Sequence, residues 1–237
     1  VVDRSVKNES IVFGRSYCDY CHAKLSTFDL VPILSFVGLR ARCRYCRHKL
    51  SWQYPIVETL VGVLFAATFY FLAASTTFSF VGILYYLAII STLVVVAVVD
   101  LKFSLIPTTF VFGAAILALF RNYFYLSSAD FVQAVFGAFV LALFFLAIVL
   151  VTRGRGMGTG DIPLVFLLGL FLGWPQSLLS TFLAFVSGAV ISIFLLLFGR
   201  KKFGQAVPFG PFLIGAAIVV LFWGNTLTNL YLKLLTP

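Results

Sequence analysis

Three long stretches without a charged side chain constrain the fold of this chain more than any other feature. They lie between Thr59 and Val99, between Ile162 and Gly199, and between Phe203 and Leu232. Each is long enough for at least one helix of about 20 residues, the length that crosses a bilayer. The chain is 62% hydrophobic and 11% charged, whereas a soluble domain is roughly 45–50% apolar and about 25% charged. The sequence therefore predicts an all-α polytopic membrane protein.

The first 55 residues differ in composition from the rest of the chain. They are polar and basic, and they contain all four cysteines and both histidines. We expect an N-terminal segment outside the membrane, residues 1–55, followed by a transmembrane domain, residues 56–237. About seven membrane helices are expected, and the two short ones are expected to tilt or to insert only partly. The predicted ranges are 56–74, 80–100, 107–121, 131–152, 161–174, 176–199 and 210–227.

The basic residues predict which side of the membrane each loop faces. If the N-terminal segment lies in the cytoplasm, the loops near 102–107, 153–160 and 200–209 lie there too. Fifteen of the 17 lysines and arginines then share the cytoplasmic side, as the positive-inside rule requires. The net charge of +9 is explained by this topology and by attraction to anionic lipid. We therefore expect no nucleic-acid partner.

The four cysteines form two Cys-x-x-Cys pairs, and this pattern is typical of a metal site. Each pair brings two thiolates onto one ion, and two pairs complete a tetrahedral four-sulfur site for structural zinc. A four-cysteine shell leaves no position for a catalytic water. Two disulfides are the alternative, but they rarely persist in a reducing cytoplasm. His22 and His48 adjoin the pairs and are expected beside the site rather than as ligands. The predicted ligands are Cys18, Cys21, Cys43 and Cys46.

Two aspartates stand where apolar runs begin or end. Asp100 closes the run 93–99, and Asp161 opens the run 162–174. Carboxylates at the edge of hydrocarbon are costly and usually mark a functional site. The predicted topology places both at the cytoplasmic face, so they are expected to work as a pair. The alternative is that each is an ordinary interfacial residue, paired with Lys102 or Arg155.

Paired carboxyls of this kind predict the chemistry of an aspartic protease. Two nearby carboxyls do not easily both ionise, so they share one proton. The ionised member then activates a water, and the protonated member donates to the carbonyl oxygen of the scissile peptide bond. Glycines before a catalytic carboxylate let an extended substrate approach closely.

Three further residues are candidate substrate contacts. Gly158 and Gly160 precede Asp161 in the run Gly156-Met-Gly-Thr-Gly-Asp161. Glu58 enters a predicted span near the same face. It is either a residue favoured by the helix dipole, a salt-bridge partner for the basic segment, or a substrate contact, and we favour a structural role.

The order of these motifs resembles that of the type IV prepilin peptidases, membrane aspartic proteases of the Gly-x-Gly-Asp kind. The resemblance covers most of the chain, and it is the combination of motifs that makes it specific. The motifs are Val1–Arg4, Gly14-Arg15-Ser16, the cysteine pairs, Asp29-Leu-Val-Pro32, Leu34-Ser35, Tyr54-Pro-Ile-Val-Glu58, Asp100 with Ile106-Pro107, Gly156–Asp161 and Pro208-Phe-Gly-Pro211.

The resemblance implies a bacterial inner-membrane enzyme that removes the basic leader of prepilins and pseudopilins at the cytoplasmic face. It implies Asp100 and Asp161 as the catalytic pair and the cysteine segment as a cytoplasmic zinc-binding region. Some members also methylate the new N-terminus with S-adenosylmethionine, and we leave that activity open for this chain. The family's first membrane helix is not in this sequence, so seven spans are expected where the family has eight.

Two positions differ from the family's usual residues, and two alternative functions are also considered. Pro163 stands where the family often has lysine, and Asp19 stands where it often has proline. A related protease for other membrane-anchored precursors is one alternative function. A non-catalytic membrane scaffold or transporter with a zinc-bound docking segment is another, and it predicts that the two aspartates lie far apart.

Overall fold

The computed structural model describes residues 16–18, 20–73, 79–154, 156–198 and 207–235. Within these ranges, every regular element longer than an isolated β-bridge is a helix. The all-α prediction is therefore confirmed for the described residues. The chain divides into two compact units, Val1–Ser91 and Thr92–Pro237, with the division inside one helix. The predicted boundary after residue 55 stays a prediction.

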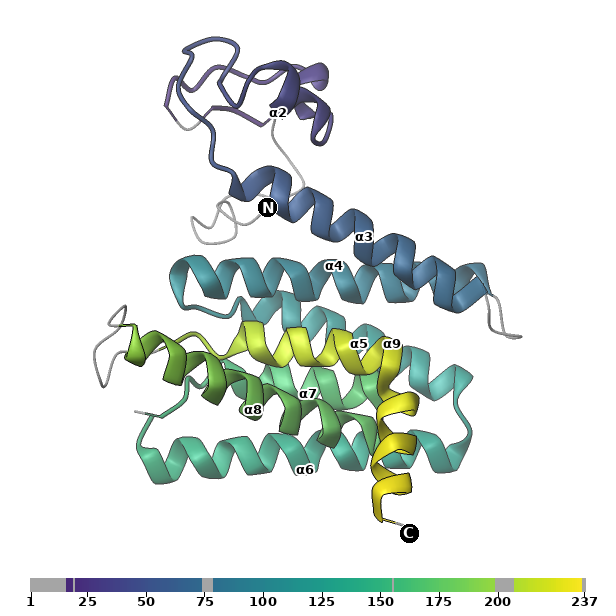
Figure 1. Cartoon of the computed structure of the whole chain (residues 1–237). Helices are drawn as coiled ribbons and strands as arrows, with labels where there is room; N and C mark the ends of the chain where they lie inside the picture. The colour runs from purple at the N-terminus through teal and green to yellow at the C-terminus, as the bar shows by residue number, and fades with distance from the viewer. Residues whose placement is uncertain (1–15, 19, 74–78, 155, 199–206, 236–237) are drawn as a thin grey trace. The chain divides into compact units, whose positions relative to one another are not determined.

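The first unit contains the cysteine segment and one long helix (Figure 1). The cysteine segment has little regular structure beyond the short η1, Thr27–Leu30, and α2, Leu34–Gly38. α3 follows as Gln53–Ala73 and begins three residues earlier than predicted. Pro55 lies in its first turn, where a missing N–H costs nothing because that N–H has no helical partner.

The second unit is a bundle of helices (Figure 1). Each of the remaining six spans predicted from the sequence is a helix. Their ends lie within four residues of the predicted ones, except that α9 continues eight residues beyond the predicted end at 227. The unit begins within α4, and its helices are α4 (Phe80–Phe103), α5 (Thr108–Tyr125), α6 (Ser128–Thr152), α7 (Asp161–Leu172), α8 (Gln176–Leu197) and α9 (Gly210–Leu235).

The short helix α7 forms the centre of this bundle. It contacts α5, α6, α8 and α9, and eight of its 12 residues are buried. A helix that is apolar on all sides is stable only when surrounded by other helices or by lipid. Gly169 allows the closest approach, because a Cβ there would collide with the backbone of Ala138 on α6. Small residues of this kind let membrane helices pack with their backbones close together.

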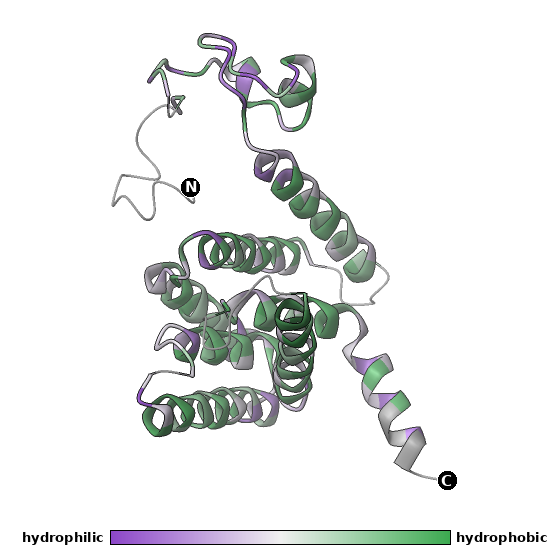
Figure 2. Cartoon of the chain, turned by 60° about the vertical axis from the view of Figure 1, so that its left-hand side comes forward, coloured by the Kyte–Doolittle hydropathy of each residue, from purple (hydrophilic) through white to green (hydrophobic). Residues whose placement is uncertain are grey.

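Five helices in the described part of the chain are long and apolar enough to cross a membrane. They are α3, α4, α6, α8 and the part of α9 up to Leu230. α5 and α7 correspond to the two spans expected to be short. Hydrophobic residues cover the helices, and hydrophilic ones gather in the cysteine segment and near helix ends (Figure 2). The chain is thus a multi-pass membrane protein, and seven crossings remain a prediction.

The loop predicted between the spans 107–121 and 131–152, at 121–130, is too long. α5 continues to Tyr125 and α6 begins at Ser128, so only two residues connect them. Asn122 lies inside α5, where it is buried and its side-chain amide donates to the carbonyl of Leu170, 2.7 Å away. That carbonyl lies in the last turn of α7, where helix carbonyls have no partner in their own helix. Asn122 can therefore be buried within α5, because α7 supplies a hydrogen-bond partner for its side chain.

Several residues used to predict the membrane orientation lie outside the described residues. They include Arg4, Lys7, Arg15, Arg155 and Arg200–Lys202. The motifs Val1–Arg4 and Gly14-Arg15, and Asp19, also lie there. The cytoplasmic orientation therefore stays a prediction.

Candidate active site and metal centre

Asp100 is a buried carboxylate near the end of α4. Only 5% of its surface is exposed, and the fully buried Val96 and Val99 lie in the same helical turn. Its backbone carbonyl accepts the N–H of Ser104. Ser104 has a positive φ of 52°, so the helix ends at the residue before it, Phe103. The apolar run of α4 thus carries Asp100 into the interior of the bundle, and the turn that follows leaves it close to the helix end.

Asp161 is the first residue of α7 and is equally buried, with 5% exposed. The N-terminus of a helix carries a partial positive charge and free N–H groups, which favour a carboxylate. Gly158, three residues earlier, lies against this side chain, because a Cβ on Gly158 would be 3.5 Å from Oδ2 of Asp161. Loop and helix end together hold this side chain.

Both carboxyl groups lie inside the second unit. They are close enough for the charge of Asp100 to act on Asp161. Two buried carboxyls whose charges interact do not both ionise readily, and such a pair shares a proton. Shared protonation of this pair would provide both a base and an acid in one site, which is the requirement for activating water against a carbonyl.

The two motifs that surround the aspartates contact each other through Gly160. A Cβ on Gly160 would lie 2.9 Å from the Cβ of Ile106, in the turn between α4 and α5. Any larger residue would therefore separate the loop before Asp161 from the turn after Asp100. Gly160 thus has a packing reason to be glycine. That Gly158 and Gly160 contact substrate stays a prediction.

Gly210 is a part of the site to which sequence reasoning assigned no role. Its backbone N–H donates to Oδ2 of Asp100 over 3.0 Å, between residues 110 positions apart. A Cβ on Gly210 would lie 2.5 Å from the same oxygen, so only glycine fits. The available signal was the motif Pro208-Phe-Gly-Pro211, which was noted but given no chemistry.

The four cysteines converge on one point in the first unit. Their sulfur atoms all lie within 4.8 Å of one another, and Sγ of Cys18 is 3.9 Å from Sγ of Cys46. A tetrahedron with zinc–sulfur bonds of about 2.3 Å has edges of about 3.8 Å. All four are free thiols rather than disulfides. The donor set and spacing therefore fit a structural zinc ion.

The two cysteine pairs sit in turns with the same hydrogen bonds. In the first, Cys18 N–H donates to Ala23 and His22 N–H donates back to Cys18. In the second, Cys43 N–H donates to His48 and Arg47 N–H donates back to Cys43. A single antiparallel bridge closes each turn, between 17 and 24 and between 42 and 49. Because the two turns have the same backbone hydrogen bonds, each presents its two sulfur atoms to the common cluster in a similar geometry.

The charges of the sulfurs also favour a cation. Backbone hydrogen bonds from Cys21 and then from Tyr20 lower the pKa of the Cys18 thiol to about 7, although burial opposes this. At Cys46, a backbone hydrogen bond from His48 favours the thiolate, but desolvation and the other three sulfurs outweigh it and raise its pKa to about 11. Four thiolates at this spacing repel one another, so full ionisation requires a bound cation.

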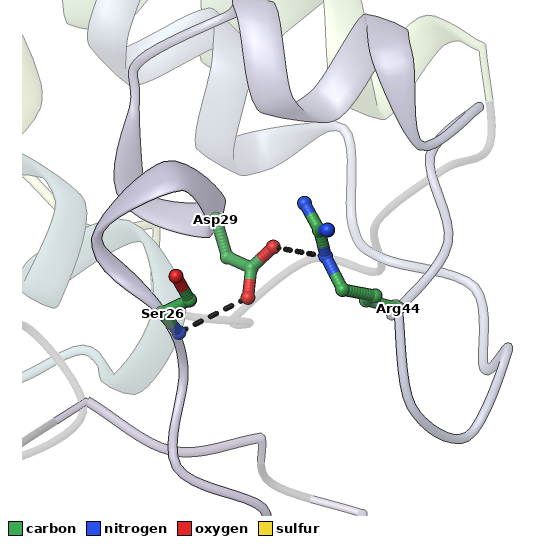
Figure 3. Close-up of polar contacts among 3 residues, drawn as sticks. All are labelled: Ser26, Asp29 and Arg44. Atoms are coloured by element: carbon green, nitrogen blue, oxygen red, sulfur yellow. Dashed lines mark hydrogen bonds and ion pairs between the residues drawn. The ribbon is translucent and has the colours of Figure 1, made fainter.

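An ion pair links η1 to the second cysteine turn (Figure 3). Nε of Arg44 donates to Oδ1 of Asp29 over 2.7 Å, and the other carboxylate oxygen accepts the N–H of Ser26 over 3.0 Å. The Asp29 side chain is 3% exposed, whereas that of Arg44 is 52% exposed, so water still reaches the pair from the arginine side. Arg44 lies between Cys43 and Cys46, and this contact therefore ties the metal segment to the helix beside it.

Glu58 closes a strained turn in the same unit. Oε2 of Glu58 accepts the N–H of Ile33 over 2.8 Å. Ile33 has φ 60° and ψ −49°, and the N–H of Leu34 donates to the carbonyl of Pro32, so the three residues form a γ-turn. This backbone conformation is rare and strained, above all for a β-branched residue. Contact of Glu58 with substrate stays a prediction.

We expect Glu58→Ala to lower the free energy of unfolding of the first unit by about 1 kcal/mol, because the Ile33 N–H loses its acceptor. Glu58→Gln keeps an oxygen acceptor and should lose less. Ile33→Gly in the Glu58→Ala background should recover part of the loss, since glycine adopts positive φ at little cost. Hydrogen exchange of residues 31–35 measures this. Unchanged exchange together with a raised KM for peptide would instead assign Glu58 to substrate binding.

Comparison with known proteins supports a relationship over nearly the whole chain. Residues 1–72 match the family described as the bacterial peptidase A24 N-terminal domain, and residues 87–193 match the type IV leader peptidase family. The chain is similar to proteins named prepilin leader peptidase/N-methyltransferase. In Legionella pneumophila the identity is 32% over 94% of this chain and 77% of the relative. In Aeromonas hydrophila it is 32% over 94% and 76%. In Bacillus subtilis it is 32% over 95% and 88%. No solved structure gives a significant match.

Proposed function

Because the chain belongs to the type IV leader peptidase family, we propose that it cleaves the N-terminal leader of type IV prepilins and pseudopilins through Asp100 and Asp161. The observation that carries the proposal is the pairing of these two buried carboxyls, which interact with each other inside an apolar bundle. Buried carboxyls are expensive, and proteins retain them where they perform chemistry.

The reaction begins with one carboxyl ionised and the other protonated. The carboxylate takes a proton from a water, and the water oxygen forms a bond to the carbonyl carbon of the scissile peptide. At the same time the protonated carboxyl gives its proton to the carbonyl oxygen. The product of this step is a tetrahedral diol, and the two carboxyls have exchanged their protonation states.

Collapse of the diol completes the hydrolysis. The carboxyl that was the base now gives its proton to the leaving nitrogen, and the carbon–nitrogen bond breaks. The other carboxylate removes the proton from one diol oxygen, which restores a carbonyl and forms the new carboxylic acid. Each carboxyl returns to its starting state, so one water is consumed and no other reactant is needed.

We propose that the site faces the cytoplasm in the bacterial inner membrane. The predicted excess of basic residues on that side supports this orientation. Prepilin precursors are then the protein partners and the bilayer is the solvent for the apolar helices. The zinc ion is proposed as a structural ion held by the four cysteines, where it would order an otherwise irregular segment.

The experiment is cleavage of a prepilin peptide by purified protein in detergent. Mass spectrometry should show one cut, at the end of the basic leader. An unrelated signal peptide of equal length is the control and should stay intact. Equal cleavage of both peptides would favour a protease for other precursors, and cleavage of neither would favour a scaffold. Transfer of a labelled methyl group from S-adenosylmethionine to the new N-terminus tests the second activity in the relatives' name.

A further inference from the structure

The N–H of Gly210 reaches Asp100 from the first residue of α9. At the start of a helix this N–H has no partner in its own helix and carries part of the positive end of the dipole. A Cβ on Gly210 would lie 2.5 Å from Oδ2 of Asp100, so the backbone of Gly210 packs tightly against the carboxylate. The direction of this one N–H therefore depends on how the residue before it is held.

Phe209, the residue before Gly210, is held by its ring. The ring centroid lies 5.1 Å from that of Phe185 on α8 and 6.3 Å from that of Phe145 on α6. Phe145 is fully buried and also contacts Phe185, at 5.8 Å. The three rings make tilted contacts at centroid separations where aromatic pairs attract one another. Two helices thus anchor one side chain at the entrance to α9.

Gly188 on α8 makes room for this ring. A Cβ on Gly188 would lie 3.3 Å from Cε2 of Phe209, closer than carbon atoms normally pack. The backbone of Phe209 is held as well, because its carbonyl accepts the N–H groups of Phe212 and Leu213 over 3.0 and 3.2 Å. Because both the ring and the carbonyl of Phe209 are held, the peptide bond to Gly210 has a fixed orientation. In that orientation the Gly210 N–H points at Asp100.

We propose that Phe209 is a positioning residue for the reaction: its ring, seated between Phe145, Phe185 and Gly188, aims the Gly210 N–H at Oδ2 of Asp100. This assignment rests on the proposed function for its catalytic consequence. One carboxylate oxygen is held by the N–H, so the other is left for the water. Loosening the ring lets the carboxyl rotate, and a misplacement of about 1 Å is enough to slow an oriented reaction by roughly 100-fold.

The kinetic test is Phe209→Ala, which removes the ring and keeps the backbone. We expect kcat for leader cleavage to fall by roughly 10- to 100-fold with KM nearly unchanged. Phe209→Leu refills part of the space and should recover much of the rate. Phe182→Ala removes an exposed ring of the same helix as Phe185 and should leave kcat unchanged. A raised KM with normal kcat would show that Phe209 contacts substrate, and would overturn the proposal.

Gly188 supplies a second, independent variant. Gly188→Val should displace the ring and lower kcat, whereas Gly113→Val, at a helical glycine with nothing within 4 Å of an added Cβ, is the matched control. In the double variant Gly188→Val/Phe209→Ala the rate should fall no further than in Phe209→Ala alone, since both act through one ring. Multiplied losses would mean that Gly188 acts elsewhere and would contradict the mechanism.

A spectroscopic readout separates this inference from the proposed function. In protein labelled with ¹⁵N-glycine, Gly210→Ala identifies the Gly210 signal among 18 glycines. Its proton should be shifted downfield by the carboxylate, and the shift should be lost in both Asp100→Ala and Phe209→Ala, but not in Phe182→Ala. A signal that Phe209→Ala and Gly188→Val leave unmoved overturns the positioning role. If the signal responds but no prepilin is cut, only the proposed function fails.

Discussion

Asp100→Asn and Asp161→Asn should each lower leader cleavage by about 10²- to 10⁴-fold, the usual contribution of a general acid or base. Asparagine has nearly the shape of aspartate but neither accepts nor donates the shared proton. Each substitution therefore removes one half of the proton transfer and leaves the packing close to unchanged. The measurement is the single-turnover rate of prepilin peptide cleavage in detergent, at saturating enzyme.

The double variant distinguishes a pair from two independent residues. Groups that act as a unit lose most of their rate with the first substitution, so Asp100→Asn/Asp161→Asn should be no slower than the slower single variant. Asp130→Asn is the matched control, since this aspartate is exposed at the start of α6, where its carboxylate accepts the Ser127 hydroxyl. Full activity in either single variant, with normal thermal unfolding, would eliminate the dyad.

The second large effect concerns the metal segment. Purified protein should contain about one zinc per chain, and Cys18→Ser or Cys43→Ser should remove it. Structural zinc binds with an apparent free energy of about 10–16 kcal/mol in small domains, and that energy is coupled to folding. Both thiols are buried, at 6% and 3% exposed, and the segment has few regular elements to replace them. Loss of the ion should therefore make residues 16–50 sensitive to protease.

The two histidines are the controls for the metal site. His22 and His48 lie next to the cysteine pairs, and the group of possible ligands in the described residues contains only the four cysteines. His22→Ala and His48→Ala should keep the zinc content of the unmodified protein. Elemental analysis measures the metal, and limited proteolysis followed by mass spectrometry measures the order of the segment. Metal-free protein with all four cysteines oxidised would contradict the zinc site.

The helices of this protein were predictable because their signal is local. Long apolar runs without charge favour helices, and each of the seven predicted segments is a helix in the structure. The prediction ended α5 too early, at residue 121. The next residue, Asn122, is satisfied inside the bundle by a carbonyl 48 residues away. Polarity in the sequence does not reveal whether a polar group is exposed or paired inside the bundle.

The candidate site was predictable to the same extent. Asp100 and Asp161 were identified because each carboxylate interrupts an apolar sequence, which is a local observation. The Cys-x-x-Cys spacing likewise identified the cysteines that cluster in the structure, since both sulfurs of a pair come from one turn. Gly210 and Phe209 carried no such signal, because glycine and phenylalanine are common in membrane helices and neither has an ionisable group.

The sequence by itself determined where the apolar helices lie, and it predicted which carboxyls carry chemistry and which sulfurs share an ion. Those properties follow from hydrophobicity, charge and spacing within a few residues. Only the tertiary structure decided that α7 lies at the centre of the bundle, that Gly160 packs on Ile106, and that an N–H 110 residues away holds Asp100. The reason is physical: such contacts arise when separate helices pack together, and packing depends on the shapes of all the helices at once.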